Sequence, residues 1–432
     1  MRSQPIVFPN RSTVPFQTDP ASHRFSMAVS DWSLSFVPMG TVLDRPLPSN
    51  TVAVDVGNGE PSEGIFDHHH RATAAESAVE RVLRHRALLL DRLRDQDAVC
   101  LIGHQQPDFD CLTALFLVWC LGTDPDRIHS SHISSEAWIR TVGDADQGRT
   151  ALSGDLTLYS CATLLRLWLR QTGGWCGSDA ETQVAKTLNV RRPLGEDDKL
   201  DRCVAVWFMR LLDVWTRRGY APDAVLSPAA VREPLTGIVQ GTQSILDTQW
   251  QRCVADHKRA QEEGNVGTLQ VPTRDGDRTK APYVRLVDPS AQAGILARTL
   301  RQWGQRTHGT PAVTVLQFSD AARTVVSVDP ESRLTLRGLG RALEAMEQAE
   351  RRRRGLRDDA PPRFQTVDDD GTTHIDPHFS SSDPWYDGRG HRYTIVDAPR
   401  AGSLLSLDAV YRCVIEGRWM ANQETSSSGT NL

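Results

Sequence analysis

The first third of the chain carries two short apolar runs, each followed by glycine and polar residues. Thr51–Val56 (TVAVDV) and Ala98–Ile102 (AVCLI) are bounded by turn-forming residues, which predicts two buried strands. Ala74–Arg94 places apolar residues at helical spacing and Asp108–Leu121 is strongly apolar, which predicts a helix after each of these two runs. Strands that alternate with helices favour an open parallel α/β sheet, in which ligands bind at the carboxyl ends of the strands.

The same patterns divide the chain into four regions. Residues 1–45 are rich in Pro, Ser and Thr and predict a loosely structured N-terminal arm with one strand-like piece, Trp32–Val37. Residues 46–155 form the expected parallel-sheet domain. Residues 156–264 carry apolar, Trp-containing segments with no strand-like run and predict a helical middle segment. Residues 265–432 again alternate strands with helices and predict a smaller C-terminal α/β domain.

The expected elements of the C-terminal domain surround a long polar, proline-rich loop at Asp358–Pro384. The expected strands are Val284–Val287, Ala312–Phe318, Thr324–Val328 and Tyr393–Val396. The expected helices are Ala291–Trp303, Leu339–Arg354 and Leu407–Glu416.

Composition narrows the class of protein. The 432 residues suggest two or three domains, and 39% apolar residues supply enough material for their cores. A net charge of −5 gives no overall argument for nucleic acid binding, and the eight cysteines show no CxxC spacing. The N-terminus lacks the apolar core of a signal peptide, and the most apolar stretch, Cys111–Leu121, is about half of what a bilayer crossing needs. We therefore expect a cytoplasmic protein with no membrane partner.

Three short segments concentrate side chains that bind metal ions, each where a strand is expected to end. Asp55 lies at the end of the first strand, Phe66–His70 (FDHHH) follows it, and Gly103–Asp110 (GHQQPDFD) follows the second strand. In the last segment a histidine precedes two carboxylates by four and six residues, which places three donors around one turn. Mixed imidazole and carboxylate ligands suit Mn²⁺ or Mg²⁺, and no thiolate competes for a softer metal.

Each of these segments also has an ordinary structural interpretation. A single aspartate at the end of a strand is more often a turn former, and three successive histidines can be a solvated loop. The HxxxDxD spacing is also met by chance, although rarely between a buried strand and an apolar helix. The presence of all three segments within residues 55–110 favours a metal site over three independent coincidences.

These segments resemble the signature motifs of the DHH phosphoesterase superfamily, which includes inorganic pyrophosphatases, exonucleases, oligoribonucleases, cyclic dinucleotide phosphodiesterases and exopolyphosphatases. Gly103–Asp110 is similar to the first motif, Val54–Gly57 to the second and Asp67–His69 to the third. Val142–Gly148 (VGDADQG) resembles the fourth, in which an aspartate lies in a short loop. The family order is first to fourth, whereas here the second and third motifs precede the first. The resemblance therefore implies a permuted member whose strand ends still converge.

Carried over motif by motif, the resemblance implies two divalent cations, Mn²⁺ in preference to Mg²⁺. The implied ligands of one cation are His104, Asp108 and Asp55. The implied ligands of the other are Asp110, His68, a loop aspartate at 146 or 144, and the bridging Asp55. Of the two loop candidates, Asp146 is preferred over Asp144 because the following Gln147-Gly148 resembles the shape of the family's loop.

Three further residues are implied to contact the substrate. His69 would face its phosphate, which makes Asp55, His68, His69, His104, Asp108 and Asp110 the expected catalytic set. Gly388–His391 (GRGH) is similar to a glycine-rich loop in the substrate-binding domain of the family, which adds Arg389 and His391. A polar turn before the next strand explains this GRGH segment equally well.

Two other segments have both a structural and a functional interpretation. The basic cluster Arg351–Arg354 is favoured at the end of a helix by the helix dipole, and it could alternatively contact phosphates. Asp383–Gly388 (DPWYDG) could stack a base on Trp385 or Tyr386, or be pinned to the core by these aromatic side chains.

The expected function is metal-dependent hydrolysis of a phosphodiester or phosphoanhydride bond, by two-metal activation of water. The substrate is expected to be a phosphorylated small molecule such as a nucleotide, or a short nucleic acid, because the C-terminal half is large and arginine-rich. One alternative is a catalytically silent nucleotide-binding sensor or partner module that keeps the fold. Another is a nuclease that acts on polymer ends and needs a continuous basic groove. The oligomeric state stays open, with a homodimer as one option.

Overall fold

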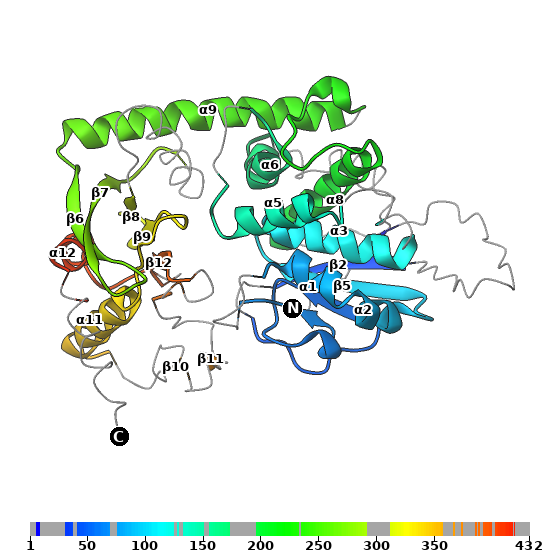
Figure 1. The fold of residues 1–432 in the computed structure, drawn as a ribbon, viewed down its shortest axis with the longest axis horizontal. Coiled ribbons are helices and arrows are strands. Elements are labelled where there is room, and N and C mark those ends of the chain that lie inside the picture. The colour runs from blue at the N-terminus through cyan, green and yellow to red at the C-terminus, as the bar shows by residue number, and fades with distance from the viewer. Residues whose placement is uncertain are drawn as a thin grey trace, which may run out of the picture. The chain divides into compact units, whose positions relative to one another are not determined.

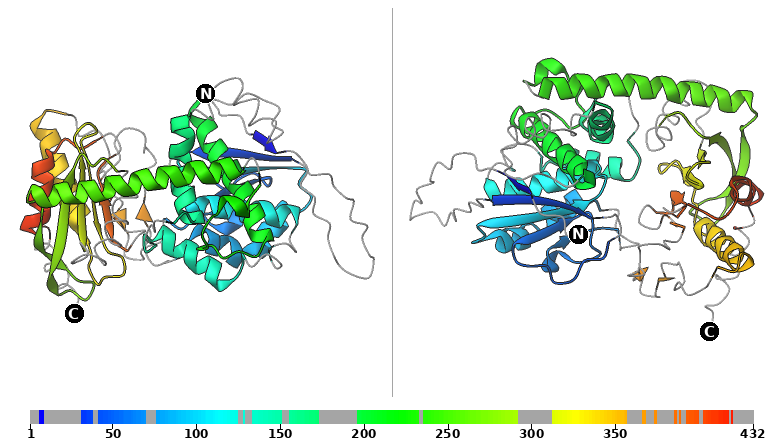
Figure 2. Two further views of the ribbon diagram at one scale, coloured as in Figure 1. Left: turned by 90° about the horizontal axis from the view of Figure 1, so that it is seen from above. Right: turned by 180° about the vertical axis from the view of Figure 1, so that it is seen from behind.

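The computed structural model of the protein describes residues 6–8, 31–37, 41–69, 76–124, 128, 133–150, 155–172, 196–232, 235–291, 312–356, 366–367, 373–374, 385–386, 388, 392–399, 402–417 and 419. The chain divides into two units (Figures 1 and 2). Unit 1 consists of Met1–His70, Glu76–Asp146 and Asp155–Leu246, and unit 2 consists of Arg71–Ala75, Gln147–Gly154 and Asp247–Leu432.

Unit 1 contains a sheet with the strand order β1-β2-β5-β3-β4. Its strands are β1 (Ile6–Phe8), β2 (Asp31–Val37), β3 (Thr51–Val54), β4 (Ile65–Phe66) and β5 (Ala98–His104). The strands β2, β5, β3 and β4 run parallel, and β1 is antiparallel to β2. The prediction of an α/β fold with a parallel sheet is confirmed.

Strand β2 differs from the sequence interpretation, which assigned it to a loose N-terminal arm. It lies inside the sheet, parallel to β5 with Val37 opposite His104, and its residues Trp32, Leu34 and Phe36 are buried. These three apolar side chains alternate with serines, which is the period of a strand with one face in a core. The expected strand-like piece is therefore present, but it is an interior strand of unit 1 and not part of a loose arm.

Unit 1 also contains helices. They are α1 (Ala78–Arg84), α2 (Arg86–Leu93), α3 (Phe109–Thr123), α5 (Glu136–Asp146), α6 (Leu158–Thr172) and α8 (Glu196–Arg217), with 3-10 turns η1 (Pro61–Glu63) and η2 (Pro228–Ala230). Of these helices, α1, α3 and α8 contact the sheet. Helix α9 (Leu235–Glu262) begins in unit 1, which ends within it at Leu246. The expected helix Ala74–Arg94 is divided in two at His85, where the backbone leaves helical geometry.

Helix α3 is central to unit 1 and explains why its sequence is apolar on every side. It contacts β5 and β3 and also packs against α1, α5, α6 and α8, so nearly all of its residues are buried. Helix α8 contacts β2 as well. The helices of residues 156–246 therefore belong to the same unit as the sheet, whereas the sequence interpretation treated residues 156–264 as a separate region.

Unit 2 contains a mixed sheet with the order β12-β9-β8-β7-β6, in which only the β7–β8 pair is parallel among the described strands. Its strands are β6 (Val266–Pro272), β7 (Arg278–Val287), β8 (Val313–Phe318), β9 (Arg323–Val328) and β12 (Ile395–Asp397). Its helices are α11 (Leu339–Arg353) and α12 (Leu407–Glu416), and β10 (Thr366–Val367) pairs with β11 (Thr373–His374).

The expected elements of this unit are largely present, but three strands are unforeseen: β6, and the two-residue strands β10 and β11 within the expected loop Asp358–Pro384. Strand β6 is an edge strand with several exposed positions, so its sequence carries little hydrophobic alternation. The expected helix Ala291–Trp303 lies outside the described residues apart from Ala291. No helix in the described part of the chain combines the length and the apolar character that a membrane crossing requires.

Candidate metal centre

The candidate site of unit 1 forms where three neighbouring parallel strands end. Asp55 follows β3 directly, Asp67 and His68 follow β4, and His104 is the last residue of β5. Because the order of these strands is β5-β3-β4, their carboxyl ends lie side by side at one edge of the sheet. The permuted order of the motifs along the chain is therefore compatible with their convergence in space.

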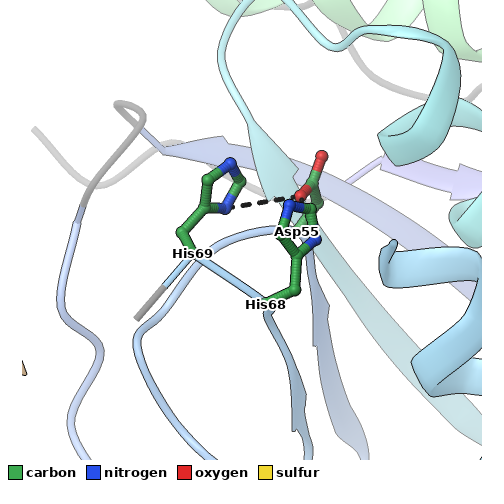
Figure 3. Close-up of side chains that lie close together, drawn as sticks. All are labelled: Asp55, His68 and His69. Carbon is green, nitrogen blue, oxygen red and sulfur yellow. Dashed lines mark ion pairs between the residues drawn. The ribbon is translucent and has the colours of Figure 1, made fainter. Parts of the chain in front are cut away.

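Asp55 is the residue around which the site is arranged (Figure 3). Its φ of 58° is left-handed, a conformation that aspartate tolerates better than most residues and that turns the chain at the end of β3. Its Oδ2 lies 3.2 Å from Nε2 of His104, and its Oδ1 lies 3.5 Å from Nδ1 of both His68 and His69. The side chain is 1% exposed, and Oδ1 has no hydrogen-bond partner among the described residues.

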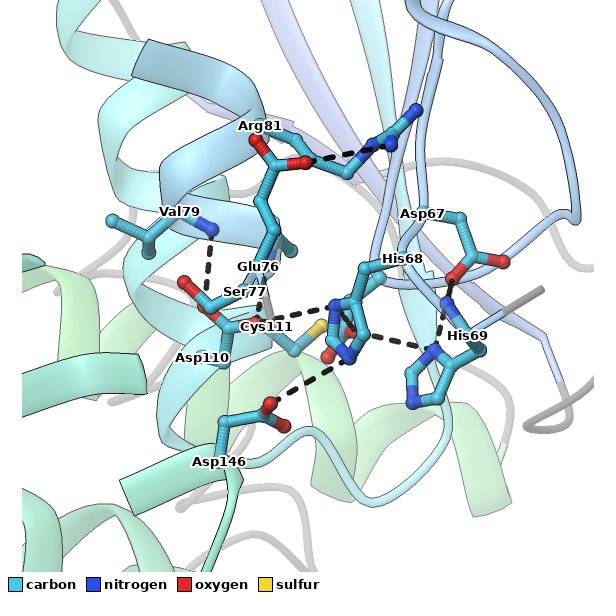
Figure 4. Close-up of polar contacts among 12 residues, drawn as sticks. Asp67, His68, His69, Glu76, Ser77, Val79, Arg81, Asp110, Cys111 and Asp146 are labelled. Atoms are coloured by element: carbon cyan, nitrogen blue, oxygen red, sulfur yellow. Dashed lines mark hydrogen bonds and ion pairs between the residues drawn. The ribbon is translucent and has the colours of Figure 1, made fainter. Parts of the chain in front are cut away.

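Asp110 and Asp146 also lie close to the ring of His68 (Figure 4). The Oδ2 atom of Asp110 lies 3.8 Å from Nδ1 of His68, and Oδ2 of Asp146 lies 3.6 Å from Nε2 of that ring. The backbone N–H groups of Ala78 and Val79 donate to the Asp110 carboxylate at 2.6 and 3.0 Å. The first residues of α1 therefore fix the orientation of Asp110, although no sequence motif marks them.

The two candidate aspartates of the fourth motif lie in a helix and not in the short loop that the resemblance implies. Both belong to the last turn of α5, whose residues Trp138, Val142 and Ala145 are buried at helical spacing. This apolar pattern extends the helix to Asp146 and brings its carboxylate to His68. Asp144 belongs to none of the potential metal-binding groups found among the described residues.

His69 is oriented by Asp67. Its backbone N–H and its ring Nδ1 both contact Oδ1 of Asp67, at 3.0 and 2.9 Å, while Asn58 donates its backbone N–H to Oδ2. Burial disfavours the charged ring, but Asp55 and Asp67 outweigh it and raise the pKa of His69 to about 10. Burial likewise opposes ionisation of Asp67, but His69 holds the pKa of that carboxyl well below its usual range. His69 is 26% exposed and stacks on the ring of His68.

The hydrogen bonds of His104 determine which of its ring nitrogens carries a proton. Its Nδ1 lies 2.9 Å from the carbonyl oxygen of Gln105, which only accepts, so Nδ1 carries a proton. In the neutral ring Nε2 is then a lone pair that faces the Asp55 carboxylate. A second proton on Nε2 removes this clash of two acceptors. Burial disfavours the charged ring, but the contacts with Cys111, Asp108 and Gln105 outweigh burial and raise the pKa of His104 to about 10. A divalent cation would replace that proton.

The remaining predicted residues lie at the edge of the cluster or outside the described chain. Asp108 is half-exposed and caps α3 by accepting the N–H of Cys111 at 3.0 Å, and its Oδ1 lies 3.9 Å from Nε2 of His104. Arg389 and His391 lie outside the described residues.

The two ambiguous segments of unit 2 have structural contacts. Arg353 and Arg354 at the end of α11 both bond to Glu350, at 2.6–2.7 Å. Trp385 is buried in the core of unit 2 and donates its backbone N–H to Glu344. These contacts fit the helix-end and pinned-loop interpretations, and burial removes Trp385 as a surface for base stacking.

Two of the buried carboxylates are held at unfavourable electrostatic positions. Burial, which the charge of His69 partly offsets, raises the pKa of Asp55 well above its usual range, and nearby carboxylates raise it further. Burial also raises the pKa of Asp110, with the charges of Asp146 and Asp108 adding to the effect. A bound cation would neutralise this accumulation of negative charge.

The donor set fits a metal ion. Three groups of described residues bring ligand atoms within 4.8 Å of one another and are mostly buried: Asp55, His68 and His69; Asp55, His104 and Cys111; His68, Asp110 and Asp146. Asp55 and His68 each belong to two groups, so the groups are contiguous.

Cys111 is the member of this set that the sequence interpretation missed, since it expected no thiolate near the site. It directly follows Asp110 in the first turn of α3 and lies three residues after Asp108, on the same side of the helix. The separation of the eight cysteines along the chain concealed it, because the other members of its group come from different strands.

Comparison of the chain with protein-family models, curated proteins and solved structures finds no match. The resemblance to the DHH phosphoesterases therefore depends on the four motifs and on the arrangement of their residues.

Proposed function

We propose that the protein is a metal-dependent phosphoesterase that hydrolyses a phosphodiester or phosphoanhydride bond. The observation that carries the proposal is the convergence of Asp55, His104, His68, Asp110 and Asp146 at one edge of a parallel sheet. A purely structural cluster would pair its carboxylates with hydrogen-bond donors, whereas Oδ1 of Asp55 is buried without one among the described residues.

We assign the residues to two adjacent cations, with Mn²⁺ preferred over Mg²⁺ because imidazole ligands suit the former better. Asp55, His104 and Asp108 would hold one cation, and His68, Asp110 and Asp146 the other, with Asp55 shared. Such a pair, when bound, lowers the pKa of a water molecule and neutralises charge on a phosphoryl group.

The residues around the metal ligands have supporting roles in this proposal. His69, whose Nδ1 is held by Asp67, is protonated at neutral pH and is partly exposed, so its Nε2–H can donate to a phosphate oxygen. Asp67 sets the orientation of that ring and maintains its charge. The N–H groups of Ala78 and Val79 hold the Asp110 carboxylate in place, so that it does not have to reorganise when a cation binds.

For the substrate we propose a nucleotide or a short oligonucleotide, in line with the size and arginine content of the C-terminal half of the chain. Arg353 and Arg354 are unlike a free phosphate-binding pair, because Glu350 already bonds to both. Recognition of the base or of further phosphates would fall to other residues.

The experiment that tests the proposal measures phosphate or mononucleotide release with Mn²⁺, on pyrophosphate, short oligonucleotides, cyclic dinucleotides and 3′,5′-bisphosphates. Asp146→Asn removes a proposed ligand, and Asp144→Asn makes the same chemical change in the same helical turn outside the cluster. We expect release by the unaltered protein and by Asp144→Asn, and loss in Asp146→Asn. Mn²⁺ binding without release of any product would favour the silent nucleotide-binding alternative, and absence of both would contradict the proposal.

A further inference from the structure

One of the three potential metal-binding groups contains a sulfur atom. Asp55, His104 and Cys111 are at most 1% exposed, and their ligand atoms lie within 4.8 Å of one another. Figure 4 shows the Cys111 side chain directed into the cluster. The neighbouring group of His68, Asp110 and Asp146 offers one nitrogen and two carboxylates, so the two groups differ in one donor: sulfur in place of oxygen.

The local packing holds the thiol at this position. A Cβ atom on Gly103, the residue before His104, would lie 2.9 Å from Sγ of Cys111, so the glycine leaves the room that the sulfur occupies. The backbone N–H of Cys111 is bonded to the Asp108 carboxylate, which fixes the first turn of α3. The sulfur therefore lies within 4.8 Å of the ligand atoms of both His104 and Asp55.

The polar atoms of the group lack a complete set of protein partners. Oδ1 of Asp55 is buried without a hydrogen bond among the described residues, and Nε2 of His104 can donate to Oδ2 of the same carboxylate only while the ring carries a second proton. One thiol proton can satisfy at most one acceptor. A cation bound by oxygen, nitrogen and sulfur would satisfy all three side chains at once.

We propose that Cys111 is a thiolate ligand and that Asp55, His104 and Cys111 form a subsite selective for a borderline cation such as Zn²⁺, beside an oxygen- and nitrogen-only subsite for Mn²⁺ or Mg²⁺. Thiolate ligands favour Zn²⁺ over harder cations, whereas carboxylate-rich sites accept Mn²⁺ and Mg²⁺. On binding, the S–H bond breaks, the sulfur electron pair bonds the cation, and the proton leaves to the solvent. This inference rests on the metal centre of the proposed function and gives it two unlike metals.

Co²⁺ is the probe for the sulfur ligand, because it resembles Zn²⁺ in ligand preference and absorbs in the near ultraviolet when a thiolate binds it. The full-length protein, stripped of metal with a chelator, is titrated with Co²⁺ while its absorption is recorded. We expect a sulfur-to-cobalt band that saturates at one equivalent, that Zn²⁺ abolishes and that Mn²⁺ leaves in place.

Two serine variants assign the band. Cys111→Ser removes the sulfur, and Cys120→Ser makes the same change at another buried position of α3, outside the three groups. We expect the band to vanish in Cys111→Ser and to persist in Cys120→Ser. In competition titrations we expect the Zn²⁺ affinity of Cys111→Ser to be lower by at least about tenfold, because even mutation of a residue that only hydrogen-bonds to a ligand causes a loss of this size. The Mn²⁺ affinity should change much less.

The outcomes separate this inference from the function on which it rests. Co²⁺ binding without the band, or a band that survives in Cys111→Ser, would overturn the sulfur ligand and leave the phosphoesterase proposal standing. A protein that binds neither Co²⁺ nor Mn²⁺ would overturn both.

Discussion

Both units of the protein bury acidic side chains, but they satisfy them differently. In unit 2, Glu347 on α11 accepts the N–H of Leu404, the indole N–H of Trp385 and the hydroxyl of Ser403. In unit 1, Asp55 faces the rings of His68, His69 and His104, and one of its oxygens has no hydrogen bond among the described residues. Burial is similar, at 1% exposed for each.

The difference lies in what surrounds each acid. Glu347 is surrounded by neutral hydrogen-bond donors from loops, so its carboxylate links segments of one core through hydrogen bonds. Asp55 is surrounded by other potential metal ligands, including two more buried carboxylates. An acid of the first kind stabilises the fold without further help, whereas acids of the second kind repel one another until a cation is bound. The groups that surround a buried acid therefore distinguish a candidate metal ligand from a structural acid better than the degree of burial does.

The largest expected effect is that of Asp55→Asn on activity. The amide cannot bridge two cations, so we expect phosphodiester or phosphoanhydride hydrolysis to fall by more than about 10³-fold, which corresponds to about 4 kcal/mol. The melting temperature of the metal-free protein should stay unchanged or rise, because a buried negative charge is removed. Retained activity, or a large loss of stability in the metal-free state, would place Asp55 with the structural acids.

Glu347→Leu should show the opposite behaviour. Removal of the carboxylate leaves the buried donors of Trp385, Ser403 and Leu404 without it as acceptor, so we expect unfolding in urea to become easier by about 3 kcal/mol. Metal binding by unit 1 should not change. Weaker Mn²⁺ binding by folded Glu347→Leu protein would contradict the distinction between Glu347 as a structural acid and Asp55 as a metal ligand.

A smaller effect is expected for His69→Gln. We expect kcat to fall by about 10–100-fold, because the variant lacks the positive charge that contacts the substrate, while Mn²⁺ affinity changes little. Asp67→Asn should reduce kcat in the same direction, since Asp67 orients the ring and maintains its charge. Steady-state kinetics combined with a separate metal titration distinguishes these effects, and a parallel loss of metal affinity would make His69 a ligand.

The smallest expected effect is a pH dependence of the metal-free protein. His69 and His104 have pKa values of about 10 in the folded chain, above the ordinary value of 6.5. A raised histidine pKa gives stability that is fully present below the unfolded value and is lost as pH rises through the folded one. Melting temperatures in chelator should therefore decrease between about pH 6.5 and pH 10. Saturating Mn²⁺ should flatten the decrease, and a flat profile in chelator would contradict the pairing of these rings.

The convergence of three candidate site residues follows from the sequence for a physical reason. Asp55, His68 and His104 each come at the end of a short apolar strand, and parallel neighbours bring such ends together whatever their order along the chain. The N-terminal capping position of Asp108 also follows from the local pattern.

The unforeseen parts depend on contacts between distant segments. The interior place of strand β2 in the sheet depends on its pairing with β5, and Cys111 becomes a candidate ligand only when α3 packs beside β3 and β5. The N–H groups that orient Asp110 belong to Ala78 and Val79, whose side chains carry no chemical signal. Asp146 was preferred from the shape of a loop, although a helix positions it.

The most direct test of a metal centre is the number and affinity of Mn²⁺ ions bound by the chelator-treated protein, measured by equilibrium dialysis or calorimetry. The account predicts that the unaltered protein and Asp144→Asn bind Mn²⁺, and that Asp110→Asn loses at least one ion or weakens binding by about 100-fold. Equal binding by all three proteins, or binding by none, would contradict it.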